Sequence, residues 1–363
     1  MSSFNLRGYY LKVVQGKPAD IKSSVVQNLL YPLSKMYGFV VKTRTFFYKY
    51  GLLKSVRLPI PVISVGNITT GGTGKTPVVE YIARFLHNKG KRVAILSRGY
   101  GAYRQQEGST VQKNICNDEY LLFMENIPDI PNVLNKDRVK GGQEAVQHFQ
   151  TECLVMDDGF QHLRLARDLD VVVIDALNPF GYEHIIPRGL LREPLAGLKR
   201  ADLFVLTHRD QCSTGEIESI VGRLHKIAGH VPVVETIHKP SCLESVYERR
   251  QLDISWLRGK KVFAFCALGN PLSFRKSIEG LGAEVICFRV FSDHHVYTAA
   301  ELQSLNAEAQ RLKPDVILVT QKDRVKIKDI LHTWDFPLWT LKIEICIVKG
   351  CEIFENKLNS ILQ

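Results

Sequence analysis

From Pro61 onward, short apolar runs alternate with amphipathic stretches. Runs rich in β-branched residues predict buried strands at 61–65, 92–96, 153–157, 170–175 and 203–207. Apolar residues at helical spacing predict helices between them, for example over 77–90 and 141–150. Strands that are apolar on both faces and separated by helices are typical of a mostly parallel α/β sheet flanked by helices.

A second series of the same kind follows in the C-terminal part of the chain. It predicts strands over 261–268, 284–290 and 315–320, with a helix over 299–312. Turn residues at 238–241 indicate a boundary between the two series. At roughly 150 residues per domain, a chain of 363 residues predicts two domains. We place the first at 59–238 and the smaller second at 239–363.

The segment 21–58 differs from the rest of the chain in its pattern and its charge. Its apolar residues recur at steps of three and four, as on one face of a helix, and Pro32 is expected to kink or end that helix. No Asp or Glu occurs from Ile21 to Val79, whereas Lys and Arg recur throughout. A basic amphipathic helix followed by aromatic residues predicts a membrane-associating segment. The alternative is a basic helix that packs on the main domain, and residues 1–20 are expected to be a loosely ordered extension.

Composition and charge narrow the class of protein. With 45% hydrophobic and 23% charged residues, the chain is expected to be folded and globular. Its net charge of +11 predicts an acidic partner: nucleic acid, an anionic membrane or a phosphorylated substrate. Eight cysteines without a C-x-x-C pair are typical of reduced thiols in the cytosol. With no signal sequence and no apolar stretch of about 18–20 residues, we expect a soluble or peripheral cytosolic protein.

The segment GNITTGGTGKTP, at 66–77, follows a predicted strand and opens a predicted helix. Glycines let backbone N–H groups surround phosphates, and the helix N-terminus attracts negative charge. Lys75 is expected to reach the β- and γ-phosphates, with the Thr76 hydroxyl on Mg²⁺. Thr69 departs from the strict pattern, which has glycine there. We predict a P-loop NTPase-like domain whose nucleotide-binding residues are Gly71, Gly72, Thr73, Gly74, Lys75, Thr76 and Pro77.

Acidic residues end two of the predicted strands. Asp157 and Asp158 come at the end of one strand, where a carboxylate faces the ligand crevice of an open α/β sheet. Either could hold Mg²⁺ directly or through water. Asp175 ends the next strand, and we interpret it as structural.

The loop alone leaves the reaction open. Guanine recognition requires N/T-K-x-D, and neither 207–210 nor 320–323 has lysine in second place. Partitioning ATPases carry a signature lysine where this chain has Thr70. A kinase that uses ATP therefore remains. The rival from another class is a non-catalytic ATP-dependent switch that recruits partners through the basic helix.

Seven motifs occur in order along the chain: 66–77, SRGYG at 97–101, NDE at 117–119, 157–175 beginning DDGFQH, IPRGLLREPL at 186–195, FSDHHVYT at 291–298 and VTQKDRVK at 319–326. Together they resemble the tetraacyldisaccharide 4′-kinase family of Gram-negative bacteria, over about residues 25–340. Two departures stand in the motifs, Tyr120 in place of a proline and PRGLLREP in place of P-x-GPLREP. Neither removes a charged residue of the site.

The resemblance implies that the γ-phosphate of ATP passes to the 4′-hydroxyl of a tetraacylated glucosamine disaccharide 1-phosphate, which gives lipid IVA in lipid A biosynthesis. It implies a peripheral protein on the cytoplasmic face of the inner membrane, with ATP and Mg²⁺ as cofactors. The partners implied are the lipid and an anionic membrane surface, without nucleic acid or an obligate protein partner. It also implies a second domain that closes with the nucleotide domain over the site.

The resemblance also implies roles for individual residues. Asp118 matches the family's proposed base and His294 its partner, although the adjacent His295 leaves the register open. A carboxylate can accept the proton of an alcohol as the bond to phosphorus forms, whereas Asp118 could also be a simple helix cap. The remaining residues implied are Lys75, Arg192 and Glu193 in catalysis, Arg98 and Arg138 in substrate binding, and Thr76, Asp157 and Asp158 at the metal.

Overall fold

The computed structural model describes residues 10, 13–14, 21–98, 118–229, 231–248, 250–330 and 334–362. The chain forms two compact units, each built from segments that are not contiguous in sequence. Unit 1 comprises Met1–Arg98, Asn135–Ile237 and Ile347–Gln363, and unit 2 comprises Gly99–Leu134 and His238–Cys346. The predicted division into 59–238 and 239–363 therefore differs from these units. Residues 99–134 lie in unit 2 although they precede the predicted boundary, and residues 347–363 lie in unit 1 although they follow it.

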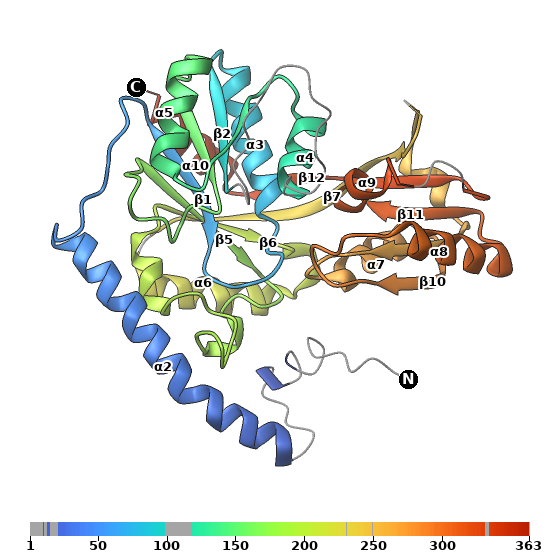
Figure 1. Ribbon diagram of the computed structural model, residues 1–363, viewed down its shortest axis with the longest axis horizontal. Helices are drawn as coiled ribbons and strands as arrows, with labels where there is room; N and C mark the ends of the chain where they lie inside the picture. Colours follow the sequence, from blue (N-terminus) through green and yellow to red (C-terminus); the bar gives the residue numbers. More distant parts are fainter. Residues whose placement is uncertain are drawn as a thin grey trace. The chain divides into compact units, whose positions relative to one another are not determined.

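Unit 1 contains a parallel sheet in the order β6-β5-β1-β4-β2, with β7 parallel to β6 (Figure 1). Most of its strands are buried on both faces, which explains their continuous apolar sequences. The prediction of a mostly parallel α/β sheet flanked by helices is confirmed. The elements are α2 (Ile21–Lys49), β1 (Val62–Asn67), α3 (Lys75–Asn88), β2 (Val93–Ser97), α5 (Arg138–Phe149), β4 (Cys153–Asp157), β5 (Leu169–Asp175), β6 (Leu203–Thr207), α6 (Thr214–Ala228), the first part of β7 (Val233–Ser245) and α10 (Cys351–Asn359).

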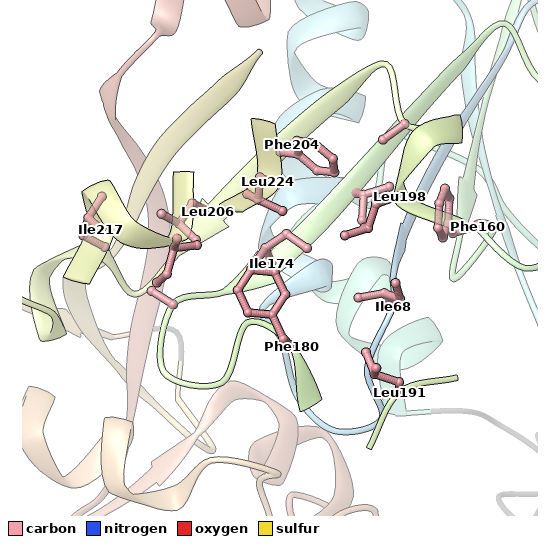
Figure 2. Packing of buried hydrophobic residues seen from close by; sticks show 14 residues of the cluster. Ile68, Phe160, Ile174, Phe180, Leu191, Leu198, Phe204, Leu206, Ile217 and Leu224 are labelled. Atoms are coloured by element: carbon pink, nitrogen blue, oxygen red, sulfur yellow. The ribbon is translucent and has the colours of Figure 1, made fainter. Parts of the chain in front are cut away.

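Helices cover the sheet of unit 1. Figure 2 shows one apolar cluster, in which Ile174 of β5 and Phe204 of β6 pack with Leu224 of α6. Helix α3 packs against β1, β2 and β4, and α5 packs against β2. The C-terminal helix α10 joins the same unit, because the Phe354 ring stacks on Tyr81 of α3 at 5.4 Å between centroids.

Unit 2 contains a second parallel arrangement, in which β9 lies between β10 and β11, and β11 pairs with β12. Alternate residues of β9 enter two different apolar clusters, as the period of a strand requires. Ala264 packs with Phe274 of α7, and Phe263 packs with Leu302 of α8, so each face of β9 has its own helix. The elements are α4 (Asp118–Asn126), β3 (Asn132–Leu134), the rest of β7, β8 (Gln251–Leu252), β9 (Lys261–Cys266), α7 (Pro271–Gly280), β10 (Glu284–Val290), α8 (Ala299–Leu312), β11 (Val316–Thr320), α9 (Gln321–Ile327) and β12 (Leu338–Lys349).

One sequence expectation for the N-terminal part, that Pro32 could end the helix, needs correction. Helix α2 continues through Pro32 without a boundary. Its Ser34 hydroxyl donates to the Ile185 carbonyl at 2.6 Å, which attaches the helix to unit 1. Most of the predicted extension 1–20 lies outside the described residues. Of those described, Val13 and Val14 are buried, and the Tyr10 hydroxyl donates to the Pro187 carbonyl at 2.9 Å.

Candidate active site

The loop 68–74 joins the end of β1 to the first turn of α3 in unit 1. Gly71 and Gly74 have φ of +112° and +81°, which lie in the left-handed region that favours glycine. Gly74 is also the residue that precedes α3, and it has no side chain to cap the first N–H groups of the helix. Those donors, with the positive end of the helix dipole, suit a phosphate group.

A neighbouring segment, 186–195, holds this loop by backbone hydrogen bonds. Thr70 N donates to the Leu190 carbonyl at 2.7 Å, and Arg192 N donates to the Ile68 carbonyl at 2.8 Å. Between them, Thr69 forms a β-bridge with Leu191. A bridge is extended backbone that any residue adopts, which explains why threonine replaces the glycine of the strict motif.

The glycine of the 186–195 segment has a steric reason. A Cβ at Gly189 would lie 2.0 Å from the His184 carbonyl oxygen, so no larger residue fits this turn. The contact indicates that its smallness shapes the segment that supports the phosphate loop.

Three charged side chains converge at the mouth of the loop. Lys75 Nζ lies 3.4 Å from Asp158 Oδ1, and Arg192 Nη1 lies 2.8 and 2.9 Å from the two oxygens of Asp158. Burial by itself would raise the pKa of the Asp158 carboxyl, but Lys75 and Arg192 outweigh it and lower that pKa to about 2. The carboxylate is therefore ionised at neutral pH, between two cations.

Asp157 and Arg138 lie behind this cluster. The buried guanidinium of Arg138 donates to the Leu96 carbonyl at 3.0 Å and to the Asp157 carbonyl at 2.9 Å, at the ends of β2 and β4. Burial lowers the pKa of Arg138 to about 10, so it stays protonated. These contacts give Arg138 a part in joining the ends of β2 and β4. Arg98, which follows β2, is exposed.

The carboxylate of Glu193 is buried, whereas the side chain of its neighbour Arg192 is partly exposed. Arg200 Nη2 donates to it at 2.9 and 3.0 Å, and Gln161 Nε2 donates at 2.9 Å. The same Gln161 amide also donates to the Asn67 carbonyl at 2.8 Å. The Glu193 carboxylate therefore connects the 186–195 segment to the strand that precedes the loop.

Two further residues of unit 1 support the loop and were missed in the sequence. The Thr207 hydroxyl, at the end of β6, donates to the Thr73 carbonyl at 2.9 Å. The Asn67 amide donates to the Thr69 carbonyl at 2.8 Å and to the Thr73 hydroxyl at 3.0 Å. Asn67 stood inside the quoted motif, but only its position at the end of β1 shows what its side chain does. Asp175 binds His208 at 2.8 Å, in agreement with a structural part.

A second cluster lies wholly in unit 2. Asp118 is the first residue of α4, and its Oδ2 lies 3.1 Å from Nδ1 of His294. Burial by itself would raise the pKa of Asp118, but His294 and Lys326 outweigh it and lower that pKa. The hydrogen bond to Asp118 in turn raises the pKa of the His294 imidazole, despite partial burial. The fold thus brings together the two residues that the resemblance paired.

The neighbouring His295 has a different partner. Its Nε2 lies 3.2 Å from a carboxylate oxygen of Glu301, and its ring stacks on Phe291. His294 has φ of +60°, a conformation uncommon outside glycine, which turns the two adjacent histidines to different partners. The register that the sequence left open is therefore decided geometrically in favour of His294 as the residue that contacts Asp118.

Lys75, Asp158 and Arg192 form the first cluster. Together with Thr76 and Asp157, it fits a magnesium ion bound with a nucleotide. Mg²⁺ prefers oxygen ligands and is usually held by one or two carboxylates plus substrate phosphates. Thr76, in the first turn of α3, supplies a hydroxyl, and Asp157 and Asp158 supply carboxylates at the end of β4. Among the described residues no group of three His, Cys, Asp or Glu side chains could hold a metal. With a nucleotide bound, phosphate oxygens and water would be the further ligands of such an ion.

Comparisons with known proteins agree on one family. The family model of tetraacyldisaccharide-1-P 4'-kinase (LpxK) matches residues 26–363. A tetraacyldisaccharide 4'-kinase of Halothermothrix orenii is 36% identical over 366 residues, which cover 94% of each chain. Its counterpart in Syntrophus aciditrophicus is 37% identical over 348 residues, covering 90% of this chain and 91% of that one.

A solved structure is similar over most of the chain. The crystal structure of the "apo" form of LpxK from Aquifex aeolicus in complex with ATP has a TM-score of 0.69 and 29% identity. It covers 93% of this chain and all of that one. The resemblance found in the motifs is thereby confirmed over nearly the whole length. The chain belongs to the tetraacyldisaccharide 4′-kinase family.

Proposed function

We propose that this protein transfers the γ-phosphate of ATP to the 4′-hydroxyl of a tetraacylated glucosamine disaccharide 1-phosphate. The product is lipid IVA, an intermediate of lipid A biosynthesis. Membership of the 4′-kinase family supports this reaction. The observation that carries it is the pairing of Asp118 with His294, since a nucleotide switch has no need of a positioned base.

The first cluster is the donor side of this proposal. The N–H groups of the loop and Lys75 would hold the β- and γ-phosphates, and Arg192 would neutralise the charge that develops on transfer. Thr76, Asp157 and Asp158 would hold Mg²⁺, whose contribution is to neutralise phosphate charge. Asp158 keeps Lys75 and Arg192 within reach before the nucleotide arrives, because it binds both cations.

The second cluster is the acceptor side. Asp118 accepts the proton of the 4′-hydroxyl as the new oxygen–phosphorus bond forms. The bond between the γ-phosphorus and the bridging oxygen breaks, and ADP leaves with that electron pair. His294 orients the Asp118 carboxylate through Nδ1. The lowered pKa leaves the Asp118 carboxylate ionised at neutral pH, and its base function would rest on its position beside the acceptor hydroxyl rather than on its basicity.

The test is transfer of label from γ-labelled ATP to tetraacyldisaccharide 1-phosphate in mixed detergent micelles. We expect a labelled lipid phosphorylated at the 4′ position. The rival switch would bind and slowly hydrolyse ATP without labelling the lipid. That outcome would leave the fold assignment intact and overturn the acceptor.

We also propose that α2 docks the protein on the cytoplasmic face of the inner membrane, where the acceptor lipid is anchored by its acyl chains. Large apolar side chains of this helix are exposed: Leu29, Met36, Phe39 and Val40 have exposed fractions of 61 to 71%. Exposed aromatic residues follow at its end, Phe46 and Tyr50. None of the described helices has both the length and the hydropathy that crossing a bilayer requires. Helix α2 would lie in the membrane interface, drawn to anionic lipid by about 1 kcal/mol per Lys or Arg.

Charge reversal tests the docking. We expect the triple change Lys35→Glu, Lys42→Glu and Arg44→Glu to abolish most cosedimentation with vesicles that contain anionic lipid and to slow lipid turnover. The reason is that each reversal replaces attraction to the leaflet by repulsion. The matched control reverses three exposed lysines elsewhere, Lys226, Lys239 and Lys276. Equal sedimentation of the two triple variants would contradict the docking role of α2.

A further inference from the structure

Helix α9 carries basic residues that pair with acidic residues of α4, the helix against which it packs in unit 2. Lys326 Nζ lies 2.7 Å from Oδ2 of Asp118, and Lys322 Nζ lies 3.1 Å from Oε1 of Glu119. The two lysines are four residues apart, so they share one face of α9. Lys328 forms a further ion pair, with Glu125 near the other end of α4.

Lys326 and His294 converge on the same atom. Both lie against Oδ2 of Asp118, at 2.7 and 3.1 Å, and neither contact uses Oδ1. The Lys326 side chain is only 8% exposed and that of Asp118 is 17% exposed. In such a site the loss of one charge leaves its partner buried and uncompensated, which is strongly unfavourable.

The two cations differ in their exposure to solvent. The His294 side chain is half-exposed, whereas that of Lys326 is buried. The hydrogen bond to Asp118 raises the pKa of the His294 imidazole. The other charged groups near the pair are Glu119, Asp293 and Lys322.

We propose that Lys326 is a positioning residue for phosphoryl transfer: it fixes Oδ2 of Asp118 and thereby presents Oδ1 as the atom that accepts the proton of the acceptor hydroxyl. This inference rests on the proposed function, and within it on Asp118 as the base. Lys326 becomes a third residue beside the pair of Asp118 and His294. It lies in the motif at 319–326, whose basic residues had no role assigned from the sequence.

The experiment compares Lys326→Met with Lys328→Met, which removes the ion pair between the residue just after α9 and Glu125 of α4 and does not involve Asp118. We expect Lys326→Met to lower kcat by about 10- to 100-fold, as partial loss of a general base does. The KM for ATP should stay unchanged. The acid limb of the kcat/KM profile should move up by about one pH unit, because an opposite charge has been removed from Asp118. Lys328→Met should leave the acid limb in place.

Lys326→Arg provides a second readout that keeps the charge and protects against loss of folding. We expect its acid limb to coincide with that of the wild type. If it moves by a pH unit, or if Lys326→Met leaves the profile unchanged, the inference is overturned. Asp118→Asn separates this from failure of the proposed function. If Asp118→Asn is fully active, Asp118 is not the base and the proposed mechanism is wrong. If Asp118→Asn is inactive but Lys326→Met has a wild-type profile, only the role of Lys326 is overturned.

Discussion

Asp118→Asn is expected to lower kcat for lipid phosphorylation by about 10²- to 10⁴-fold, the range typical of a lost general base. An amide matches the carboxyl in size but cannot accept the hydroxyl proton. ATP affinity should be unchanged, since Asp118 belongs to unit 2 and the residues assigned to the phosphates belong to unit 1. Steady-state turnover with the lipid acceptor and calorimetric titration with ATP measure the two quantities separately.

The matched control is Asp129→Asn, an exposed acid just after α4 in the same unit. It removes the same negative charge and should retain wild-type turnover. Wild-type kcat in Asp118→Asn would show that the proton leaves by another route. A loss of ATP affinity equal to the loss of kcat would show that the change acts on the nucleotide instead.

Lys75→Met is expected to reduce kcat/KM for ATP by about 10²- to 10³-fold, as the loss of one preorganised charge-stabilising group does. The ammonium is assigned to the β- and γ-phosphates, where negative charge develops on the leaving group. Its removal also takes away one of the two cations that bind Asp158. Unlike Asp118→Asn, this variant should bind ATP more weakly in the calorimetric titration.

A lysine at the opposite end of the same helix serves as the control. Lys89 follows the last turn of α3 and is exposed. Lys89→Met should bind and use ATP like the wild type. If both variants lose ATP affinity to the same degree, the effect comes from the net charge of the protein and the assignment of Lys75 is wrong.

Strands buried on both faces were the best predicted elements. The runs at 153–157 and 203–207 coincide with β4 and β6. The partly exposed β10 at 284–290 and the helix α8 at 299–312 also have the predicted bounds. The turn residues at 238–241 lie where the chain passes from unit 1 to unit 2, after Ile237, but β7 continues through them as one strand. Neighbouring strands override local turn propensity there, and sequence patterns do not contain that information.

The residues of the candidate site also fall into those that the local sequence predicts and those that it does not. Residues that act through the local loop, such as Lys75 and Thr76, can be read from a contiguous motif. Asp118 and His294 required a resemblance, because nothing local distinguishes one acid or one histidine from the rest. Lys326 was missed because its significance comes from a contact with a residue far away in the chain. The contacts of Arg138 with the carbonyls of two strand ends could not be predicted either, because no linear pattern reveals them.

The interleaved units have a consequence for the order of folding during synthesis. Every segment of unit 2 has left the ribosome before residues 347–359, which complete unit 1 by packing Phe354 of α10 on Tyr81 of α3. Domains generally fold as units once their residues are available. Unit 1 therefore completes its fold only after every segment of unit 2 has been synthesised.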